Sequence, residues 1–363
     1  MKLLWIGKSR TDGHAGDEVF DRQMIGAIRE LGIDVVHLAP QPTTRLQQGW
    51  GLLKGWPHNR ALYNTFDNRT RIAAAAIGCD GAIISWEPFD CFVPVLDLPL
   101  IAVLHNITSQ SLASARPESI SAALFARMAR SWEKKCYSRR GRLVAVAALS
   151  RADEKLVRAV RNGPVLYTPP GMPPRMPLDR SAVLTAELTI EGTYDWWPKR
   201  RDLELFVREY TAAGRPFPIR ADNLPSSAMQ GLQPAPLEDA SVAVRVGLIT
   251  DRFKSGFKLK STSYIAKNCI VLSYADIVED FSSIVDHELF VRRIRHAGEI
   301  QRHLDDIRRI SSPDLVSRFE AFKTNCARLF SWRQSAERLV APLNPTVHGA
   351  EGLSVRSADP SHT

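Results

Sequence analysis

The chain has 363 residues, more than the roughly 250–300 at which a single hydrophobic core stops growing, so two domains are expected. Its composition, 44% hydrophobic and 24% charged, excludes extensive disorder and is typical of a globular protein. The net charge of +9 favours anionic partners, which are nucleic acid, anionic lipid or phosphorylated ligands.

The cysteines and the apolar runs indicate in which cellular compartment the protein is expected. The five cysteines are scattered and form no CxxC pair, so we expect neither a disulfide framework nor a zinc site. The apolar run of residues 1–7 is too short for a signal peptide, because charged residues follow at once. No window approaches the roughly 20 apolar residues of a membrane-spanning helix. A cytoplasmic protein is therefore expected.

Residues 1–168 alternate short apolar runs with helical patterns, as in parallel sheets built from βαβ units. Six strands are expected, at Leu3–Gly7, Asp34–Ala39, Gly81–Trp86, Leu100–His105, Arg142–Ala148 and Val165–Thr168. The helices expected between them are Val19–Leu31, Arg69–Ile77, Ser119–Arg139 and Arg151–Val160. This pattern predicts a first doubly wound α/β domain.

A proline-rich stretch at 169–180 reads as a linker, because proline fixes φ and removes a backbone donor. A second domain follows at 181–325, with strands expected at Leu188–Gly192, Pro218–Arg220, Val242–Leu248, Ile270–Ser273 and Glu288–Val291. Its helices are expected at Asp202–Ala212, Lys258–Ala266, Glu299–Ile310 and Leu315–Ala341. The last helix, at 326–343, is a candidate to cross back to the first domain, and 344–363 is expected to be a flexible tail.

The loop Gly7–Asp17 follows the first expected strand and leads into a helix. Its glycines, Gly16 among them, let backbone N–H groups approach an anion at the helix N-terminus. The loop matches neither GxGxxG nor GxxxxGK[ST], which disfavours a nucleoside triphosphatase. His14 and Asp17 are candidates for a catalytic base on the acceptor side. The alternative is a flexible loop in which Asp17 caps the helix.

His105 and Asn106 end the fourth expected strand, at the sheet edge where ligands bind in this architecture. A histidine there can hydrogen-bond a sugar hydroxyl without a fixed charge. The alternative is a structural histidine that bonds a neighbouring carbonyl. Glu87, at the tip of the preceding strand, is a weaker candidate.

The segment from Ser255 to Lys260 is the most informative one. A glycine loop leads directly into a helix, so backbone donors, the helix dipole, Lys258 and Lys260 converge on one point that suits a pyrophosphate. The alternative is a basic, solvated helix start. It is the weaker reading, because a cation at a helix N-terminus opposes the dipole unless an anion is bound.

This segment resembles the donor-binding loop GSGxKxKxxEAxAxGxPVV of GT-B glycosyltransferases in the family 4 group. Further segments match that group in order, over about residues 1–342: His105-Asn106, residues 132–153, Pro169-Pro170-Gly171, residues 192–199 and Phe330-Ser331-Trp332. Each motif is short, and their ordered series carries the resemblance.

The resemblance implies a GT-B fold, in which two Rossmann-like domains face each other across a cleft. It further implies metal-independent hexosyl transfer from a nucleotide-diphosphate sugar to a saccharide or lipid-linked acceptor, in bacterial polysaccharide or glycoconjugate synthesis. No cofactor or metal is expected beside the nucleotide-sugar substrate. The positions that carry over are Lys199, Ser255, Gly256, Lys258 and Lys260 for the diphosphate, Ser263 for the ribose and His105 for the sugar.

The sequence departs from the family at Ser263, where a glutamate usually holds the ribose hydroxyls. Ser255, eight residues earlier, replaces an acid that is often present, and Asn268 replaces a glycine. A serine cannot accept the paired hydrogen bonds of a carboxylate, so weaker ribose binding is expected. A catalytically degenerate GT-B-like partner protein is therefore the alternative, with an epimerase acting on the nucleotide sugar as a third interpretation.

Basic and aromatic residues of the first domain suit an anionic membrane surface, at the inner face of the cell membrane. They are Trp50 and Lys54 within 49–57, and Arg127, Arg130, Lys134, Lys135, Arg139, Arg140 and Arg142. The alternative is an ordinary solvated face beside a locally packed loop. Nucleic acid is not expected, because no stacking motif accompanies the charge.

Overall fold

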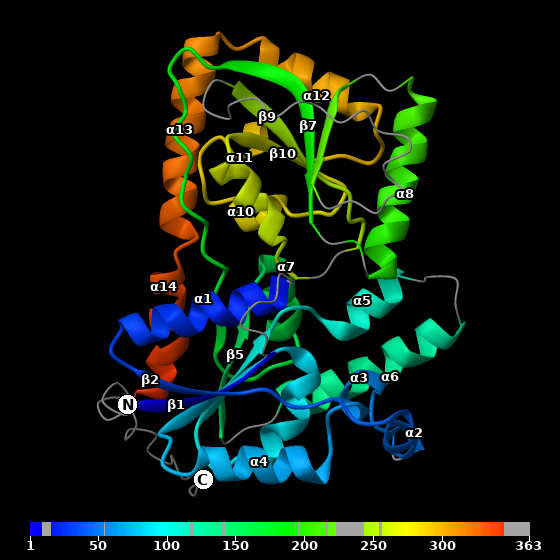
Figure 1. The fold of residues 1–363 in the computed structure, drawn as a ribbon, viewed down its shortest axis with the longest axis vertical. Coiled ribbons are helices and arrows are strands. Elements are labelled where there is room, and N and C mark those ends of the chain that lie inside the picture. Colours follow the sequence, from blue (N-terminus) through cyan, green and yellow to red (C-terminus); the bar gives the residue numbers. More distant parts are fainter. Residues whose placement is uncertain are drawn as a thin grey trace, which may run out of the picture.

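The computed structural model describes residues 1–8, 16–53, 55–115, 120–138, 142–192, 194, 196–214, 217–222, 243–253 and 256–344. Two parallel sheets, one above the other in Figure 1, are each flanked by helices. This arrangement confirms the predicted two-domain α/β class. In the part of the chain that the structure covers, no helix is long and apolar enough to cross a membrane.

The first sheet contains all six predicted strands in the order β2-β1-β3-β4-β5-β6. They are β1 (Lys2–Ile6), β2 (Asp34–Leu38), β3 (Gly81–Ser85), β4 (Leu100–Leu104), β5 (Leu143–Ala148) and β6 (Val165–Tyr167). Every residue of β3 and β4 is buried, because helices cover both faces of the sheet. All carboxyl ends therefore lie at one edge, next to the second domain.

Four predicted helices flank this sheet: α1 (Gly16–Glu30), α4 (Phe66–Ala76), α6 (Ile120–Tyr137) and α7 (Arg151–Arg158). The sequence did not predict α2 (Arg45–Leu53), α3 (His58–Ala61), the 3₁₀ helix η1 (Glu87–Val95) or α5 (Thr108–Ala115). These pieces are short, and η1 contains two prolines, so no helical period marks them.

The second sheet has the order β11-β10-β9-β7-β8. Its strands are β7 (Val183–Glu191), β8 (Ile219–Asp222), β9 (Ala243–Ile249), β10 (Cys269–Ser273) and β11 (Val291–Arg293). The flanking helices are α8 (Trp197–Ala212), α10 (Leu259–Ala266), η2 (Val278–Phe281), α11 (His287–Phe290) and α12 (Glu299–Arg308). The prediction of a strand over Glu288–Val291 was wrong, because α11 occupies most of that range and the strand begins at Val291.

Two segments join the domains and pack against each other. The linker after β6 donates from the Met172 amide to the Phe330 carbonyl at 2.8 Å. The predicted single helix over 315–341 is instead two, α13 (Ser312–Leu329) and α14 (Trp332–Val340), followed by η3 (Ala341–Leu343). Ser331 breaks it by capping α14, with its hydroxyl accepting from the Gln334 amide at 3.3 Å. In Figure 1, α13 follows the upper domain and α14 packs beside α1 of the lower one.

Candidate functional site

The two loops singled out in the sequence meet where the domains face each other. Gly16 begins α1, and a Cβ built on it would lie 3.2 Å from Leu259 Cδ1 at the start of α10. Gly256 has a φ of +69°, and a Cβ there would overlap the carbonyl oxygen of His105. The helix N-termini of both domains therefore converge on the predicted sugar-binding tip. His14 and Ser255 lie outside the described residues.

A cluster of three lysines forms the second-domain side of this site. Lys258 Nζ lies 3.8 Å from Asp251 Oδ2 and 3.7 Å from the centroid of the Phe253 ring. Lys260 Nζ donates to the Tyr194 hydroxyl at 3.3 Å. Lys199, on the first turn of α8, interacts electrostatically with the same Asp251. The three lysines predicted to bind the diphosphate are thus brought together around Asp251.

Burial opposes the positive charge of these lysines, and nearby carboxylates favour it. Lys258 is 9% exposed and Asp251 is 2% exposed. Burial lowers the pKa of Lys258 to about 8, against the attraction of Asp251, and it also lowers the pKa of Lys199 and of Lys260. Burial by itself would raise the pKa of Asp251, yet the three lysines bring it below its usual value. Asp251 acts on all three lysines, and each lysine also feels a second carboxylate: Asp153 for Lys258, Glu191 for Lys260 and Asp17 for Lys199.

Gly192 makes room for the cluster at the end of β7. Its φ is +120°, and a Cβ there would overlap the side chain of Lys260. A residue with a side chain would therefore be strained in the backbone and would displace the ammonium group. The positive φ and the nearby Lys260 side chain thus explain why the matched 192–199 motif begins with glycine.

Ser263 lies half-buried one turn into α10, and its carbonyl accepts from the Lys267 amide at 3.1 Å. Asn268 has a φ of +63°, a left-handed conformation that asparagine tolerates better than most residues. Its side-chain amide donates to the Pro177 carbonyl at 2.7 Å. Asparagine can therefore stand where the family usually has glycine.

His105 is buried at the tip of the first sheet. Its Nε2 lies 2.9 Å from Ser85 Oγ, and Phe20 contacts its ring edge-on at 4.8 Å between centroids. Burial lowers the pKa of His105 to about 4, with Asp17 acting against this and Lys8 reinforcing it. The imidazole is therefore neutral at pH 7 and can exchange hydrogen bonds with an uncharged hydroxyl.

Asp17 is in the first turn of α1 and forms an ion pair with Lys8. Burial would raise its pKa, but Lys8 brings the pKa of Asp17 below its ordinary value. Lys8 Nζ also lies 3.6 Å from the ring centroid of Trp86, whose φ of +91° is strained for a residue with a side chain. On this side of the site the charges are paired.

Glu87 holds the strand tip in place, because its carboxylate accepts from the amide of Asn106. Burial raises the pKa of Glu87 to about 8, against the effect of that hydrogen bond. The weaker candidate of the sequence analysis thus supports the backbone next to His105.

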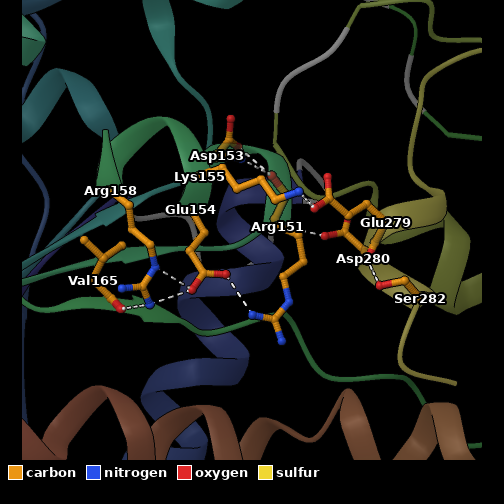
Figure 2. Close-up of polar contacts among 10 residues, drawn as sticks. Arg151, Asp153, Glu154, Lys155, Arg158, Val165, Glu279, Asp280 and Ser282 are labelled. Atoms are coloured by element: carbon orange, nitrogen blue, oxygen red, sulfur yellow. Dashed lines mark hydrogen bonds and ion pairs between the residues drawn. The ribbon is translucent and has the colours of Figure 1, made fainter. Parts of the chain in front are cut away.

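Polar contacts join α7 of the first domain to η2 of the second domain (Figure 2). The amide of Arg151 donates to Asp280 at 2.6 Å, and Lys155 pairs with Glu279. Asp153 accepts from the amide of Gly256 at 2.9 Å, so an anionic side chain of the first domain contacts the predicted phosphate loop. Burial raises the pKa of Asp153 to about 6 and that of Asp280 to about 7.

The sequence analysis missed four polar residues of this site: Asp21, Ser85, Asp153 and Asp251. Two of them carried a usable signal, because Ser85 ends β3 and Asp251 comes two residues after β9, at the carboxyl edges where ligands bind. Asp21 and Asp153 lie within helices, where a polar residue is ordinary. Within the described residues, no group of three or more histidines, cysteines or acidic residues is arranged to hold a metal ion.

The basic surface of the first domain is only partly described. Arg127, Arg130, Lys134 and Lys135 are exposed on α6. Arg139 and Arg140, and the side chains of Trp50 and Lys54, lie outside the described part. Ile120 and Leu124, at the start of α6, are 89% and 57% exposed, so the helix also presents apolar side chains to solvent.

No protein-family model matches the sequence, and no curated protein matches it. Solved structures match it over 94% of this chain and 99% of theirs. The α,α-trehalose-phosphate synthase (UDP-forming) from Burkholderia vietnamiensis has a TM-score of 0.56 at 11% identity over that coverage. The E. coli trehalose-6-phosphate structure bound with UDP-2-fluoro glucose has a TM-score of 0.54 at 11% identity. The UGT transferase from Siraitia grosvenorii in complex with UDP has a TM-score of 0.51 at 10% identity. This chain has the GT-B fold.

The GT-B fold agrees with the ordered series of motifs in the sequence, while membership of family 4 stays a prediction. The roles of the individual site residues also stay predictions. In the GT-B frame, the lysine cluster belongs to the second domain and His105 to the first, on opposite sides of the interface. The fold itself leaves the reaction open, because one fold hosts many activities.

Proposed function

We propose that this chain is a glycosyltransferase that moves a sugar from a nucleoside-diphosphate sugar to an acceptor. The observation that carries the proposal is the cluster of Lys199, Lys258 and Lys260 around Asp251. Buried ammonium groups are costly unless they are paired, and a diphosphate would bring further negative charge to all three lysines. The helix N-terminus at Leu259 adds backbone donors for the same anion.

In the proposed reaction an acceptor hydroxyl forms the new bond to the sugar as the bond between sugar and diphosphate breaks, and the hydroxyl proton passes to Asp17. The three lysines stabilise the negative charge that builds up on the leaving diphosphate. They thereby take the role that a metal ion has in other transferases. Neutral His105 hydrogen-bonds a hydroxyl of the transferred sugar. Asp17, already paired with Lys8, faces the acceptor as a hydrogen-bond acceptor.

A uridine diphosphate sugar is the first donor to test. Two of the similar structures hold UDP or UDP-2-fluoro glucose, and a third is named as UDP-forming. The acceptor that we propose is a saccharide or a lipid-linked saccharide of bacterial polysaccharide or glycoconjugate synthesis. This choice is supported by the family motifs and by the basic face of α6.

The test is the binding of UDP by calorimetry, together with a sugar-transfer assay, on wild type and Lys258→Ala. A charge-assisted contact to phosphate of roughly 2–3 kcal/mol predicts an affinity loss on the order of 100-fold. Arg308→Ala is the control, because Arg308 lies at the end of α12 in an exposed ion pair with Asp305. Unchanged UDP binding in Lys258→Ala would remove the proposed donor site.

Two other activities are distinguished by the same assays. A catalytically degenerate partner protein, favoured by Ser263 in place of the family glutamate, would bind acceptor tightly without binding UDP. An epimerase would convert the nucleotide sugar itself and would need no acceptor. Formation of a glycosylated acceptor, retained in the presence of a metal chelator, supports metal-independent transfer over both.

We also propose that the exposed face of α6 contacts anionic lipid in the cytoplasm, at the inner face of the membrane. Apolar Ile120 and Leu124 precede four exposed cations on this helix, a combination that suits a membrane interface. Co-sedimentation should show binding to phosphatidylglycerol vesicles and none to phosphatidylcholine vesicles. Lys134→Glu together with Leu124→Ser should abolish it, and equal binding to both vesicle types would contradict the proposal.

A further inference from the structure

A buried chain of three polar side chains lies behind the predicted sugar-binding tip. Ser85 Oγ is 2.5 Å from Asp21 Oδ1 and 2.9 Å from His105 Nε2. The three residues come from α1, from the end of β3 and from the residue after β4. All three are buried, so their hydrogen bonds are made to one another and not to solvent.

Packing fixes the positions of these groups. A Cβ on Gly7 would overlap Asp21 Oδ2, so glycine at the end of β1 lets the carboxyl group approach the sheet. Phe20, next to Asp21 on α1, contacts the His105 ring edge-on, with an interplanar angle of 77°. The ring of His105 is therefore held by a hydrogen bond on one side and an aromatic contact on another.

The protonation of Asp21 determines which groups donate and which accept in the hydrogen bonds that link Asp21, Ser85 and His105. A serine hydroxyl has one proton, and an ionised Asp21 can only accept it. With Asp21 ionised, the hydroxyl can only accept from His105, so Nε2 carries the proton of the neutral imidazole. Burial raises the pKa of Asp21 well above its usual value, whereas hydrogen bonds from the Ser85 hydroxyl and the Lys8 amide favour the ionised form. A protonated Asp21 would instead donate to Ser85 and reverse the chain, which leaves the proton of His105 on Nδ1.

We propose that Asp21 is a positioning residue that fixes the tautomer of His105 through the hydroxyl of Ser85. Nε2 carries the proton, and Nδ1 is left with a lone pair. The ring therefore offers its free nitrogen as an acceptor to a ligand hydroxyl. In the reverse tautomer the same atom would be a donor, so Asp21 decides which kind of partner His105 accepts.

The tautomer can be read directly by proton–nitrogen correlation NMR on the full chain labelled at histidine, with His105→Gln to assign the signal. We expect the Nε2–H form in wild type at neutral pH. Ser85→Ala deletes one oxygen from a packed strand end and should give a mixture of tautomers. Ser85→Thr keeps the hydroxyl and should restore the Nε2–H form. Asp21→Asn should also shift the population.

A wild-type protein with mainly Nδ1–H, or an Nε2–H population unchanged in Ser85→Ala, would overturn the proposal. Ser85→Ala decides the matter by itself if Asp21→Asn does not fold. The use of this tautomer in sugar transfer rests on the proposed function. There, Ser85→Ala should lower kcat about tenfold with less than about a twofold change in the KM of the donor. A protein with the expected tautomer that binds no nucleotide sugar would refute the proposed function and leave the tautomer assignment standing.

Discussion

On the second domain, three lysines surround the carboxylate of Asp251, whereas on the first domain Lys8 is paired with Asp17 and His105 is neutral. The two sides of the interface thus differ in their charged groups. The second-domain side holds three buried lysines around one shared carboxylate. The first-domain side holds balanced charges and neutral hydrogen-bonding groups.

Under the proposed function, this difference assigns a different part of the ligand to each side. A diphosphate would reduce the repulsion among Lys199, Lys258 and Lys260. A sugar is uncharged and needs donors and acceptors in fixed orientations, which buried Ser85 and His105 supply.

The largest effect is expected from Asp251→Asn, which removes the carboxylate from among the three lysines. Leaving buried charge unpaired costs about 3 kcal/mol of unfolding free energy, so this variant should be strongly destabilised. Pyrophosphate should restore more stability to the variant than to wild type, because it replaces the lost charge. Urea unfolding with and without pyrophosphate measures both effects.

Asp305→Asn provides the control for this variant, because Asp305 and Arg308 form an exposed ion pair. It should change stability far less, since exposed ion pairs contribute little. Equal losses in the two variants would show that the lysine cluster is not under electrostatic strain.

A smaller loss of stability is expected where the loop before α10 of the second domain contacts the first domain. Gly256→Ala puts a Cβ against the His105 carbonyl at a φ of +69°, which should cost about 2 kcal/mol of stability and weaken UDP binding. Gly26→Ala is the matched exchange in α1, where a Cβ meets nothing within 4 Å. Helix propensity predicts that it stabilises by up to about 1 kcal/mol. Chemical unfolding of both variants tests these opposite signs, and a shift in the same direction would contradict the assigned contact.

The smallest effect is a change in pH dependence at the contact between the domains. Burial raises the pKa of Asp153 to about 6 and of Asp280 to about 7, above those of unfolded aspartates. The folded protein then binds more protons than the unfolded one, so these groups make the unfolding free energy fall as pH rises from about 4 to 7. Asp153→Asn keeps the acceptor for the Gly256 amide and removes one titration, so the fall should be shallower.

Urea unfolding across this pH range measures the slope. Asp305→Asn, on the exposed face of α12, should keep the slope of wild type. A wild-type slope in Asp153→Asn would mean that Asp153 does not titrate in this window.

The sequence by itself predicted much of the fold, because each strand of the first sheet is a short apolar run bounded by polar residues or glycine. It also singled out Lys258 and Lys260 as candidates to bind a diphosphate, because cations at a helix N-terminus oppose the helix dipole unless an anion is bound. The break between α13 and α14 was missed although Ser331 and Gln334 have the spacing of a capping box, and the Ser331 hydroxyl does accept from the Gln334 amide.

Only the tertiary structure decided which residues meet. Asp251 and Tyr194 come together because β7 and β9 are neighbours in the sheet, although nearly sixty residues separate them in the chain. Asp21, Ser85 and His105 are joined in the same way, by α1 packing over β3 and β4. Local residue preferences specify strands and helix starts, whereas the pairing of buried polar groups depends on sheet order and domain contact. The sequence thus determined most of the elements and pointed to the glycine loop before α10, and the folded chain decided that Lys258 lies beside Asp251 and His105 beside Ser85.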